Sequence, residues 1–364
     1  MKTISPFTRI ARVRLVGLAG VAGLVFGSAH AATVCVGSAG ALNNALIAAE
    51  TNNESDDIRI RAGIYVAPVP DGFYYYPPSN DADIGNVTVS GGWNADCSSM
   101  AADATATVLS GNLQTPVLRF RNANGTMTVR NLSITGGYSS GVVLGALHFD
   151  HSSGFGLQVV VDRVILHHNE AYAPLYAKTQ GTITVKGSLI HSNLSTSTGA
   201  GGAVIINENG FNATYIHSNT FTNNAVTSGS TVGGLRFENT GDAQSFIRNN
   251  IFWGNDNSDL RVVGNIASRN DCSYNNVGVF NTVIVCNGAG VEQLNPKFTD
   301  PAAGDYRLAT NSPLIDEGCG PVQCTGAPDI DLRGVARPLG AAHDIGAYEG
   351  GYGFSEHIFT DGFE

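Results

Sequence analysis

The chain has 364 residues, of which 14% are charged, and its formal net charge at pH 7 is −10. This acidic balance argues against nucleic acid and anionic lipid as partners. The 45 glycines, together with many asparagines and serines, favour strands and turns over long helices.

The first 31 residues have the pattern of a secretory signal peptide. Four basic residues precede an uncharged apolar run over 15–26, and Ala29-His30-Ala31 offers a small-residue cleavage site. Removing this segment makes the formal charge −14, because it holds no acidic residue. The apolar run is shorter than the roughly 18 residues that a membrane span needs. We therefore expect a secreted or cell-surface protein of the Gram-negative bacterial type, with no membrane span in the mature chain.

The segment PDGFYYYPPSN, over 70–80, sets three tyrosines between prolines and predicts a loop. Tyrosine rings stack on sugar rings at a low cost in ordering entropy, so Tyr74, Tyr75 and Tyr76 are candidate glycan contacts. Alternatively, the loop folds over the N-terminal end of the protein and protects its core.

A seven-residue phrase recurs through the middle of the chain. Its copies are NLSITGG (131–137), RVILHHN (163–169), GSLIHSN (187–193), SNTFTNN (218–224) and NNIFWGN (249–255). Successive copies end 32, 24, 31 and 31 residues apart, which is typical of units that stack on one another. The sequence therefore predicts an all-β, single-stranded parallel β-helix.

Aligned positions of the phrase predict which side chains face inward. The fourth position is always large and apolar and is expected inside: Ile134, Leu166, Ile190, Phe221 and Phe252. The residues before each phrase alternate with a period of two, as in a strand with one buried face. The last position holds Gly137, Asn169, Asn193, Asn224 and Asn255. There we expect a turn with left-handed backbone, and side-chain hydrogen bonds between asparagines of neighbouring rungs.

These phrases resemble the parallel β-helix repeats of the pectate-lyase-like superfamily. ALNNALIAAE (41–50) and DDIRIRAGIYV (56–66) are similar to the short capping helix and first rung of such proteins. VTVSGGWNADCSS and ATVLSGN are similar to their early coils. The resemblance implies a right-handed parallel β-helix with a short N-terminal capping helix.

The end of the chain resembles a second group. NPKFTDPAAGDYRLATNSPLIDEG, DLRGVARP and HDIGAYEG are similar to the terminal segment of secreted choice-of-anchor Q proteins. The last seven residues, IFTDGFE, resemble a short ending of exported Gram-negative proteins, so they are either a sorting signal or a frayed tail. The expected divisions are a signal peptide (1–31), a cap and first coils (32–126), central repeats (127–290), C-terminal coils and terminal segment (291–350), and a tail (351–364).

One outward column carries candidate chemistry: Arg130, Asp162, Lys186, His217 and Arg248. Its members are expected on adjacent rungs, about 4.8 Å apart. In polysaccharide lyases of the superfamily, carboxylates hold calcium beside a uronate while a basic residue abstracts a proton. The resemblance makes Asp162, with Lys186 or Arg130, a candidate catalytic group. However, one carboxylate is a poor calcium site, and a surface ladder of ion pairs explains the same residues.

His167 and His191 share one repeat position and are predicted to stack. Two stacked imidazoles can bind a metal or carry a proton, whereas the simpler interpretation is a solvated pair on a polar face.

Aspartates gather near the C-terminus rather than in the central coils: Asp300, Asp305, Asp316, Asp329, Asp331 and Asp344. Nothing similar to the paired-aspartate motifs of polygalacturonases appears in the central coils. Aspartates beside glycine and proline predict turns held by side-chain hydrogen bonds to backbone, with a structural calcium ion as the alternative. No other cofactor is expected.

The cysteines form an even set in an exported chain, which predicts disulfides: Cys35, Cys97, Cys272, Cys286, Cys319 and Cys324. Of the 15 connectivities that six cysteines allow, we prefer 35–97, 272–286 and 319–324 because near neighbours along a coil are near in space. Neither a CxxC pair nor a suitable histidine spacing supports the alternative of a metal site.

Two classes of function remain open. The first is a non-catalytic secreted or surface module that binds an extracellular glycan or a surface protein in the manner of β-helical adhesins. The second is a polysaccharide lyase or glycoside hydrolase that acts on an extracellular polysaccharide. Fold alone does not choose between them. We favour the first, because no acid–base cluster converges on the central coils.

Overall fold

The computed structural model describes residues 32–52, 54–78, 85–121, 124–139, 144–151, 157–208, 212–227, 229–241, 243–264, 270–281, 288–320, 322 and 324–350. The expected signal peptide and tail lie outside the described residues. Within these ranges, no helix combines the length and the apolar character needed to cross a bilayer.

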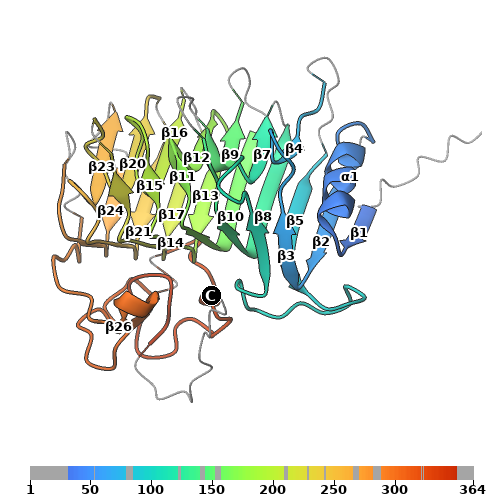
Figure 1. Cartoon of the computed structure of the whole chain (residues 1–364). Coiled ribbons are helices and arrows are strands. Elements are labelled where there is room, and N and C mark those ends of the chain that lie inside the picture. The colour runs from blue at the N-terminus through green and yellow to red at the C-terminus, as the bar shows by residue number, and fades with distance from the viewer. Residues whose placement is uncertain are drawn as a thin grey trace, which may run out of the picture.

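Parallel strands stack rung upon rung in chain order, which gives the protein a β-solenoid-like, all-β architecture (Figure 1). Each full rung supplies strands to three faces. Face one contains β1 (Ala32–Val36), β2 (Asp56–Arg61), β5 (Val87–Trp93), the first halves of β8 (Gly125–Thr135) and β10 (Leu157–His167), β13 (Ile183–Lys186), β17 (Thr214–His217), β21 (Ser245–Arg248) and β24 (Asn270–Ser273). The predicted stack of parallel strands is confirmed.

The other faces follow the same order. Face two contains β3 (Gly63–Val66), β6 (Thr107–Ser110), the second halves of β8 and β10, β14 (Leu189–His191), β18 (Thr220–Thr222), β22 (Ile251–Trp253) and β25 (Asn276–Val277). Face three contains β4 (Phe73–Tyr75), β7 (Leu118–Arg121), β9 (Gly145–Asp150), β12 (Ala173–Thr179), β16 (Ala203–Asn207), β20 (Leu235–Asn239) and β23 (Leu260–Gly264). Between faces two and three run the short strands β11 (Glu170–Ala171), β15 (Leu194–Ser195) and β19 (Ala225–Val226).

The predicted interior columns form the core. Ile134, Leu166, Ile190, Phe221 and Phe252 are in register on successive rungs, and each is fully buried. The upstream column of Val129, Val161, Val185, Ile216 and Ile247 is likewise in register and buried. Because each rung buries its apolar face only against its neighbours, the core runs the length of the stack.

The predicted asparagine column forms a hydrogen-bonded ladder. Asn169 Nδ2 donates to Asn193 Oδ1 at 2.9 Å, Asn193 to Asn224 at 2.9 Å, and Asn224 to Asn255 at 2.8 Å. The expectation of left-handed backbone at these positions was wrong by one residue. The positive φ falls on the preceding position, at Gly136, His168, Ser192, Asn223 and Gly254. That turn aims the next side chain inward, where the asparagine bonds along the stack.

A second asparagine ladder, absent from the sequence prediction, lies at the corner between faces one and two. Asn219 Nδ2 donates to Asn250 Oδ1 at 3.0 Å, and Asn250 Nδ2 donates to Asn275 Oδ1 at 2.9 Å. All three side chains are buried. The repeated phrases could have predicted this ladder, since Asn219 and Asn250 each occupy the second position of a phrase.

Removing one member of a ladder should destabilise the stack. Asn224→Ala removes the acceptor of the Asn193 backbone amide and one side-chain bond each of Asn193 and Asn255, and an unsatisfied buried polar group costs about 1 to 3 kcal/mol. Urea unfolding should show a loss of that size, whereas the exposed helix residue Asn44, changed to Ala, should show none. Equal stability of the two variants would contradict the assigned role of the ladder.

The N-terminal end of the stack is closed by the one α-helix among the described residues, α1 (Ala39–Ala49) (Figure 1). The Ser38 side chain caps it by accepting from the Ala41 amide at 3.2 Å. Leu42 and Leu46 are fully buried in the core of the solenoid. The predicted capping helix is therefore where the resemblance placed it.

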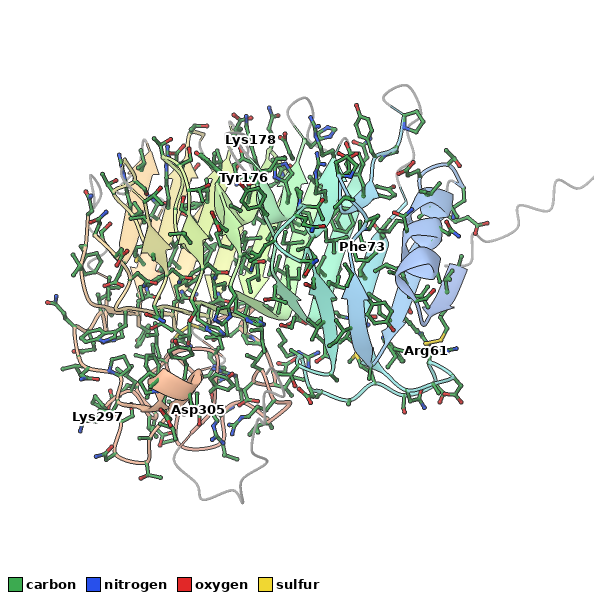
Figure 2. The ribbon with its side chains drawn as sticks, viewed as in Figure 1. Arg61, Phe73, Tyr176, Lys178, Lys297 and Asp305 are labelled. Carbon is green, nitrogen blue, oxygen red and sulfur yellow. A yellow bond between two sulfur atoms is a disulfide. The ribbon has the colours of Figure 1, made fainter. Side chains whose placement is uncertain are left out.

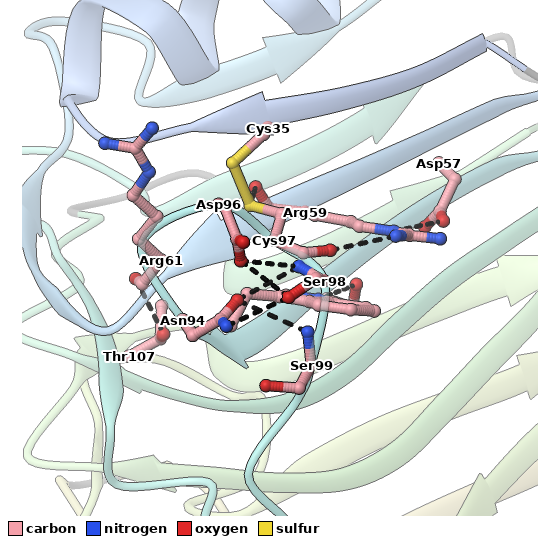
Figure 3. The surroundings of a disulfide bond; sticks show 12 residues. Cys35, Asp57, Arg59, Arg61, Asn94, Asp96, Cys97, Ser98, Ser99 and Thr107 are labelled. Atoms are coloured by element: carbon pink, nitrogen blue, oxygen red, sulfur yellow. Dashed lines mark hydrogen bonds and ion pairs between the residues drawn. A yellow bond between two sulfur atoms is a disulfide. The ribbon is translucent and has the colours of Figure 1, made fainter.

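Two predicted disulfides are present. Cys35, on β1, is bridged to Cys97 with a Cα–Cα distance of 5.8 Å, beside the Arg59–Asp57 ion pair (Figure 3). Cys319 and Cys324 are bridged within the C-terminal segment. The third expected pair stays a prediction, because Cys286 lies outside the described residues.

The tyrosine segment is a strand and not the predicted loop. Phe73, Tyr74 and Tyr75 form β4, the first strand of face three, which pairs in parallel with β7. Phe73 points into the core (Figure 2), and both it and Tyr75 are fully buried. Tyr74 is half-buried and Tyr76 is exposed. The aromatic rings alternate between inward and outward positions, which is typical of a strand. This pattern is a better predictor here than the flanking prolines, which favoured a loop.

The C-terminal segment, residues 297–350, packs against the outside of face two. It begins with the antiparallel pair β26 (Phe298–Asp300) and β27 (Asp305–Leu308), joined by a 3₁₀ turn over Pro301–Ala303. Further along, the Ala347 amide donates to Thr220 Oγ1 at 3.0 Å, and the Gly346 amide donates to Asn249 O at 2.8 Å. An apolar cluster of Ile165, Leu189, Tyr306, Leu332 and Tyr348 completes the contact.

Candidate functional site

The outward column on face one is assembled in the predicted register. Arg130 pairs with Asp162, Asp162 with Lys186, and Lys186 with His217 on successive rungs. The carboxylate of Asp162 lies 3.8 Å from the Arg163 guanidinium. Among the residues aligned with Asp162 on neighbouring rungs, the titratable side chains are basic, and none is a second carboxylate. This geometry resembles an ion-pair ladder more than a calcium site.

His217 in this column is a site residue that the sequence reasoning did not single out. Its side chain is 1% exposed, and among the described residues no group meets the geometry of a hydrogen bond with either ring nitrogen. Desolvation, followed by the positive charge of Arg248, lowers the pKa of His217 to about 4. Tyr215 and Phe246 stack beside it with ring centroids 5.2 Å apart. The imidazole is thus held neutral between two cations, Lys186 and Arg248.

The histidine pair stacks as predicted, but only His167 is partly exposed to solvent, whereas His191 is buried. The rings of His167 and His191 are parallel within 5°, with centroids 5.4 Å apart. His191 is 8% exposed because the Tyr306 ring, 5.0 Å away, covers it. Burial lowers the pKa of His167 to about 4, and that of His191 well below its usual value. His167 Nδ1 and His168 Nδ1 are 2.8 Å apart and share a hydrogen bond.

Metal binding finds no support in this pair. In the part of the chain that the structure describes, no group of three histidine, cysteine or carboxylate side chains is arranged to hold a metal ion.

The terminal carboxylates serve turns and ion pairs. Asp331 Oδ1 accepts from the Arg333 amide at 2.8 Å and from the Val335 amide at 2.9 Å, and Oδ2 pairs with the Arg333 side chain at 2.9 Å. Glu349 pairs with Arg337 at 3.1 Å, and both side chains are almost fully buried. Burial raises the pKa of Glu349 to about 7 despite the opposing charge of Arg337. Backbone amides and guanidinium groups thus occupy the oxygens that calcium would need.

The tyrosine candidates are divided between core and surface. Tyr75 is fully buried and cannot contact a ligand, which corrects its place among the candidates. Tyr74 and Tyr76 point outward and stack on each other with centroids 5.4 Å apart. Arg119 lies 4.6 Å over Tyr74, and Arg121 lies 5.8 Å over Tyr76. Side-chain stacking and cation–π contacts therefore already use these ring faces.

A cleft between face two and the C-terminal segment brings together more suitable groups. It has a volume of about 710 Å³ and is lined by Thr222, Asn223, Trp253, Gly254, Asn295, Lys297, Phe298, Pro301, Ala302 and Tyr306. Trp253 is partly exposed, and the rings of Phe298 and Tyr306 meet edge to face at 5.3 Å. Amide, hydroxyl and ammonium groups thus surround three aromatic rings, a composition suited to a polar ligand with apolar faces.

The cleft lies on the same outward column as the histidines. His167 pairs with His191, His191 with Thr222, and Thr222 with Trp253 on successive rungs. Trp253 therefore occupies the fifth position of its phrase, as the two histidines do in theirs. Sequence alignment of the phrases could have marked Trp253 as outward-facing, but not the opposing wall supplied by the C-terminal segment.

Comparison of the chain with protein-family models, with curated proteins and with solved structures finds no match.

Proposed function

We propose that the protein is an exported, right-handed parallel β-helix of the pectate-lyase-like type, with a choice-of-anchor Q-like terminal segment, that binds glycans without cleaving them outside the cell or at its surface. The observation that carries this proposal is the cleft, in which Trp253, Phe298 and Tyr306 surround a space of about 710 Å³. Sugar rings present apolar C–H faces and polar edges, which match aromatic rings beside amides and hydroxyls.

Other features support the extracellular setting. The disulfides Cys35–Cys97 and Cys319–Cys324 suit an oxidising compartment. The first 31 residues have the composition of an export signal. A stack of rungs with a partly open cleft also suits binding along an extended polymer.

Trp253→Ala should weaken glycan binding strongly. A central aromatic contact in a binding site contributes about 2 kcal/mol, which corresponds to roughly a thirtyfold rise in Kd. The mature protein would be screened against a panel of polysaccharides and oligosaccharides, and the best ligand titrated by calorimetry. Tyr76→Ala is the matched control, since Tyr76 is exposed on face three away from the cleft, and its Kd should not change. Loss of binding in Tyr76→Ala alone would move the site to the tyrosine segment.

The alternative function is a polysaccharide lyase or glycoside hydrolase, and one observation favours it. His217 is buried beside Lys186, and its pKa is lowered to about 4, a perturbation that often marks functional residues. Reducing ends and unsaturated-sugar absorbance should therefore be followed in the same panel. Turnover that Asp162→Ala abolishes would establish catalysis in place of simple binding.

A further inference from the structure

Three histidines gather at the corner between faces two and three. His167 ends β10, His168 follows it, and His191 ends β14 on the next rung. Their ring centroids lie 5.1 to 6.2 Å apart. Among the described residues, no carboxylate forms an ion pair with any of the three. Protons taken up by this cluster therefore add positive charges that have no counter-charge beside them.

The hairpin of β26 and β27 covers the most buried of these rings. The hairpin lies outside face two (Figure 1), and Tyr306 of β27 meets the His191 ring with centroids 5.0 Å apart. His167 and His168 face His191 from the preceding rung, and Thr222 is its neighbour on the following one. The imidazole of His191 is thus enclosed by two other imidazoles, a hydroxyl group and a phenol ring.

The hairpin is held in place by few buried side chains. Over residues 297–309, only Tyr306 and Leu308 are buried. Asp305 and Arg307, the charged neighbours of Tyr306, form an ion pair with each other within β27. Regions with few buried apolar contacts open locally at the lowest cost in free energy. The hairpin can therefore lift from face two without unfolding the stack.

From this geometry we infer that the β26–β27 hairpin is an acid-sensitive lid, which covers His191 at neutral pH and lifts from face two when the histidine cluster takes up protons. Lifting separates Phe298 and Tyr306 from Trp253, so the cleft loses one of its walls. The inference goes beyond the proposed glycan binding and does not depend on it, because the hairpin covers the histidine whether or not the cleft holds a ligand.

The protonation of His191 sets the direction of the change. In the closed protein, burial and then the neighbouring His167 hold the pKa of His191 well below its ordinary value. In the open form the imidazole is in water and has a pKa near 6.5. As the pH falls below about 6.5, the open form therefore binds a proton that the closed form does not, and opening becomes more favourable. At pH 5.0 the ratio of open to closed protein should be roughly thirtyfold higher than at pH 7.5.

Hydrogen exchange measured by mass spectrometry tests the lid in the absence of any ligand. Exchange at pH 7.5 and pH 5.0 would be compared after correction for the intrinsic rate, which an unstructured peptide supplies. The protection of peptides over residues 297–309 should fall about thirtyfold at pH 5.0, whereas peptides over β10 should keep theirs. Equal protection of the hairpin at both pH values would overturn the inference. So would a parallel loss over β10, because the whole protein would then be unfolding.

His191→Phe should remove most of this pH dependence, because phenylalanine keeps a ring against Tyr306 but takes up no proton. His148→Phe is the matched control. His148 is also buried and stacks on Tyr176, but it lies on face three, so its loss should leave the pH dependence of the hairpin unchanged. An acid response that keeps its full size in His191→Phe would overturn the inference.

Tyr306→Ala gives an independent check should His191→Phe fold poorly. Without the ring that covers His191, the hairpin should already have low protection at pH 7.5, with little further loss at pH 5.0. A Tyr306→Ala hairpin as well protected as that of the wild type at pH 7.5 would show that this contact does not hold the hairpin closed, and would also overturn the inference.

Discussion

Acidification from pH 7.5 to pH 4.5 should lower the free energy of unfolding by several kcal/mol, because buried histidines stay neutral in the folded protein. Burial is the main cause that lowers the pKa of His148 to about 3, and those of His167 and His217 to about 4. In the unfolded chain each has a pKa near 6.5. As the pH falls below about 6.5, the unfolded chain therefore binds protons that the folded protein does not, and stability is lost. At pH 4.5 the loss is roughly 2 to 3 kcal/mol for each histidine.

Glu349 acts in the opposite direction. Its pKa is raised to about 7 in the folded protein, from an ordinary value of 4.5. Between these values the folded protein holds a proton that the unfolded chain has released, so protonation of Glu349 favours folding as the pH falls. Burial also raises the pKa values of Glu50, Asp259 and Asp344, which act in the same direction as Glu349. Five histidines with lowered pKa values outnumber these four carboxylates among the described residues, and we expect a net loss of stability.

Urea unfolding at a series of pH values measures this effect. His217→Asn should reduce the proton uptake on unfolding by nearly one proton near pH 5, which flattens the dependence of stability on pH. The exposed Gln244, changed to Asn, is the control and should leave the dependence unchanged. A protein as stable at pH 4.5 as at pH 7.5 would show that these histidines are not held neutral by burial.

The stacked columns were predictable because the phrase repeats with an almost constant spacing. Thirty-one residues after Phe221 stands Phe252, and the two rings stack in the core with centroids 5.1 Å apart. A constant repeat length shows which residues lie on neighbouring rungs, even when the course of the chain between the repeats is not known. The left-handed corner was misplaced by one residue because asparagine tolerates positive φ, whereas here its hydrogen bonds require it to point inward.

The cleft could not be predicted, since half of it comes from a segment outside the repeat. Thr220 meets Ala347 across 127 residues, and His191 meets Tyr306 with no periodic pattern in common. The repeat alone also predicted that His191 faces solvent. In the structure the C-terminal segment covers it, because that segment has no repeat from which its position could be predicted. Contacts between a repeat and a non-repeating segment depend on shape and polar complementarity, and neither leaves a signature in sequence spacing.

The binding and catalytic hypotheses differ in where they place the ligand. Catalysis requires a group within reach of Asp162 on face one, whose nearest ion partner is Arg163 at 3.8 Å. Binding uses the cleft on face two, where the aromatic rings lie. Asp162→Ala, on face one, therefore tests turnover, whereas Trp253→Ala, on face two, tests glycan binding, so the two variants distinguish the hypotheses.

The C-terminal segment owes much of its stability to a buried ion pair, and Arg337→Met should destabilise the protein by about 3 to 5 kcal/mol. Arg337 Nη1 lies 3.1 Å from Glu349 Oε1, and the two side chains are 0% and 1% exposed. Arg337 Nη2 also donates to Gly346 O at 2.7 Å, next to the residue that bonds to Thr220 on face two. Loss of the guanidinium forces the buried Glu349 to take up a proton and leaves the Gly346 carbonyl without its side-chain donor, which together cost more than the pair itself contributes.

Urea unfolding of a double-mutant cycle tests this role. Glu349→Gln in the Arg337→Met background should recover part of the lost stability, because the unpaired carboxylate is removed. Arg236→Met is the matched control, since Arg236 forms a partly exposed ion pair with Glu238, and its loss should cost at most about 1 kcal/mol. The single Arg337→Met variant should also weaken glycan binding, because the segment that it anchors carries Lys297, Phe298 and Tyr306. Equal losses in Arg337→Met and Arg236→Met would mean that packing against face two, rather than the ion pair, holds the segment in place.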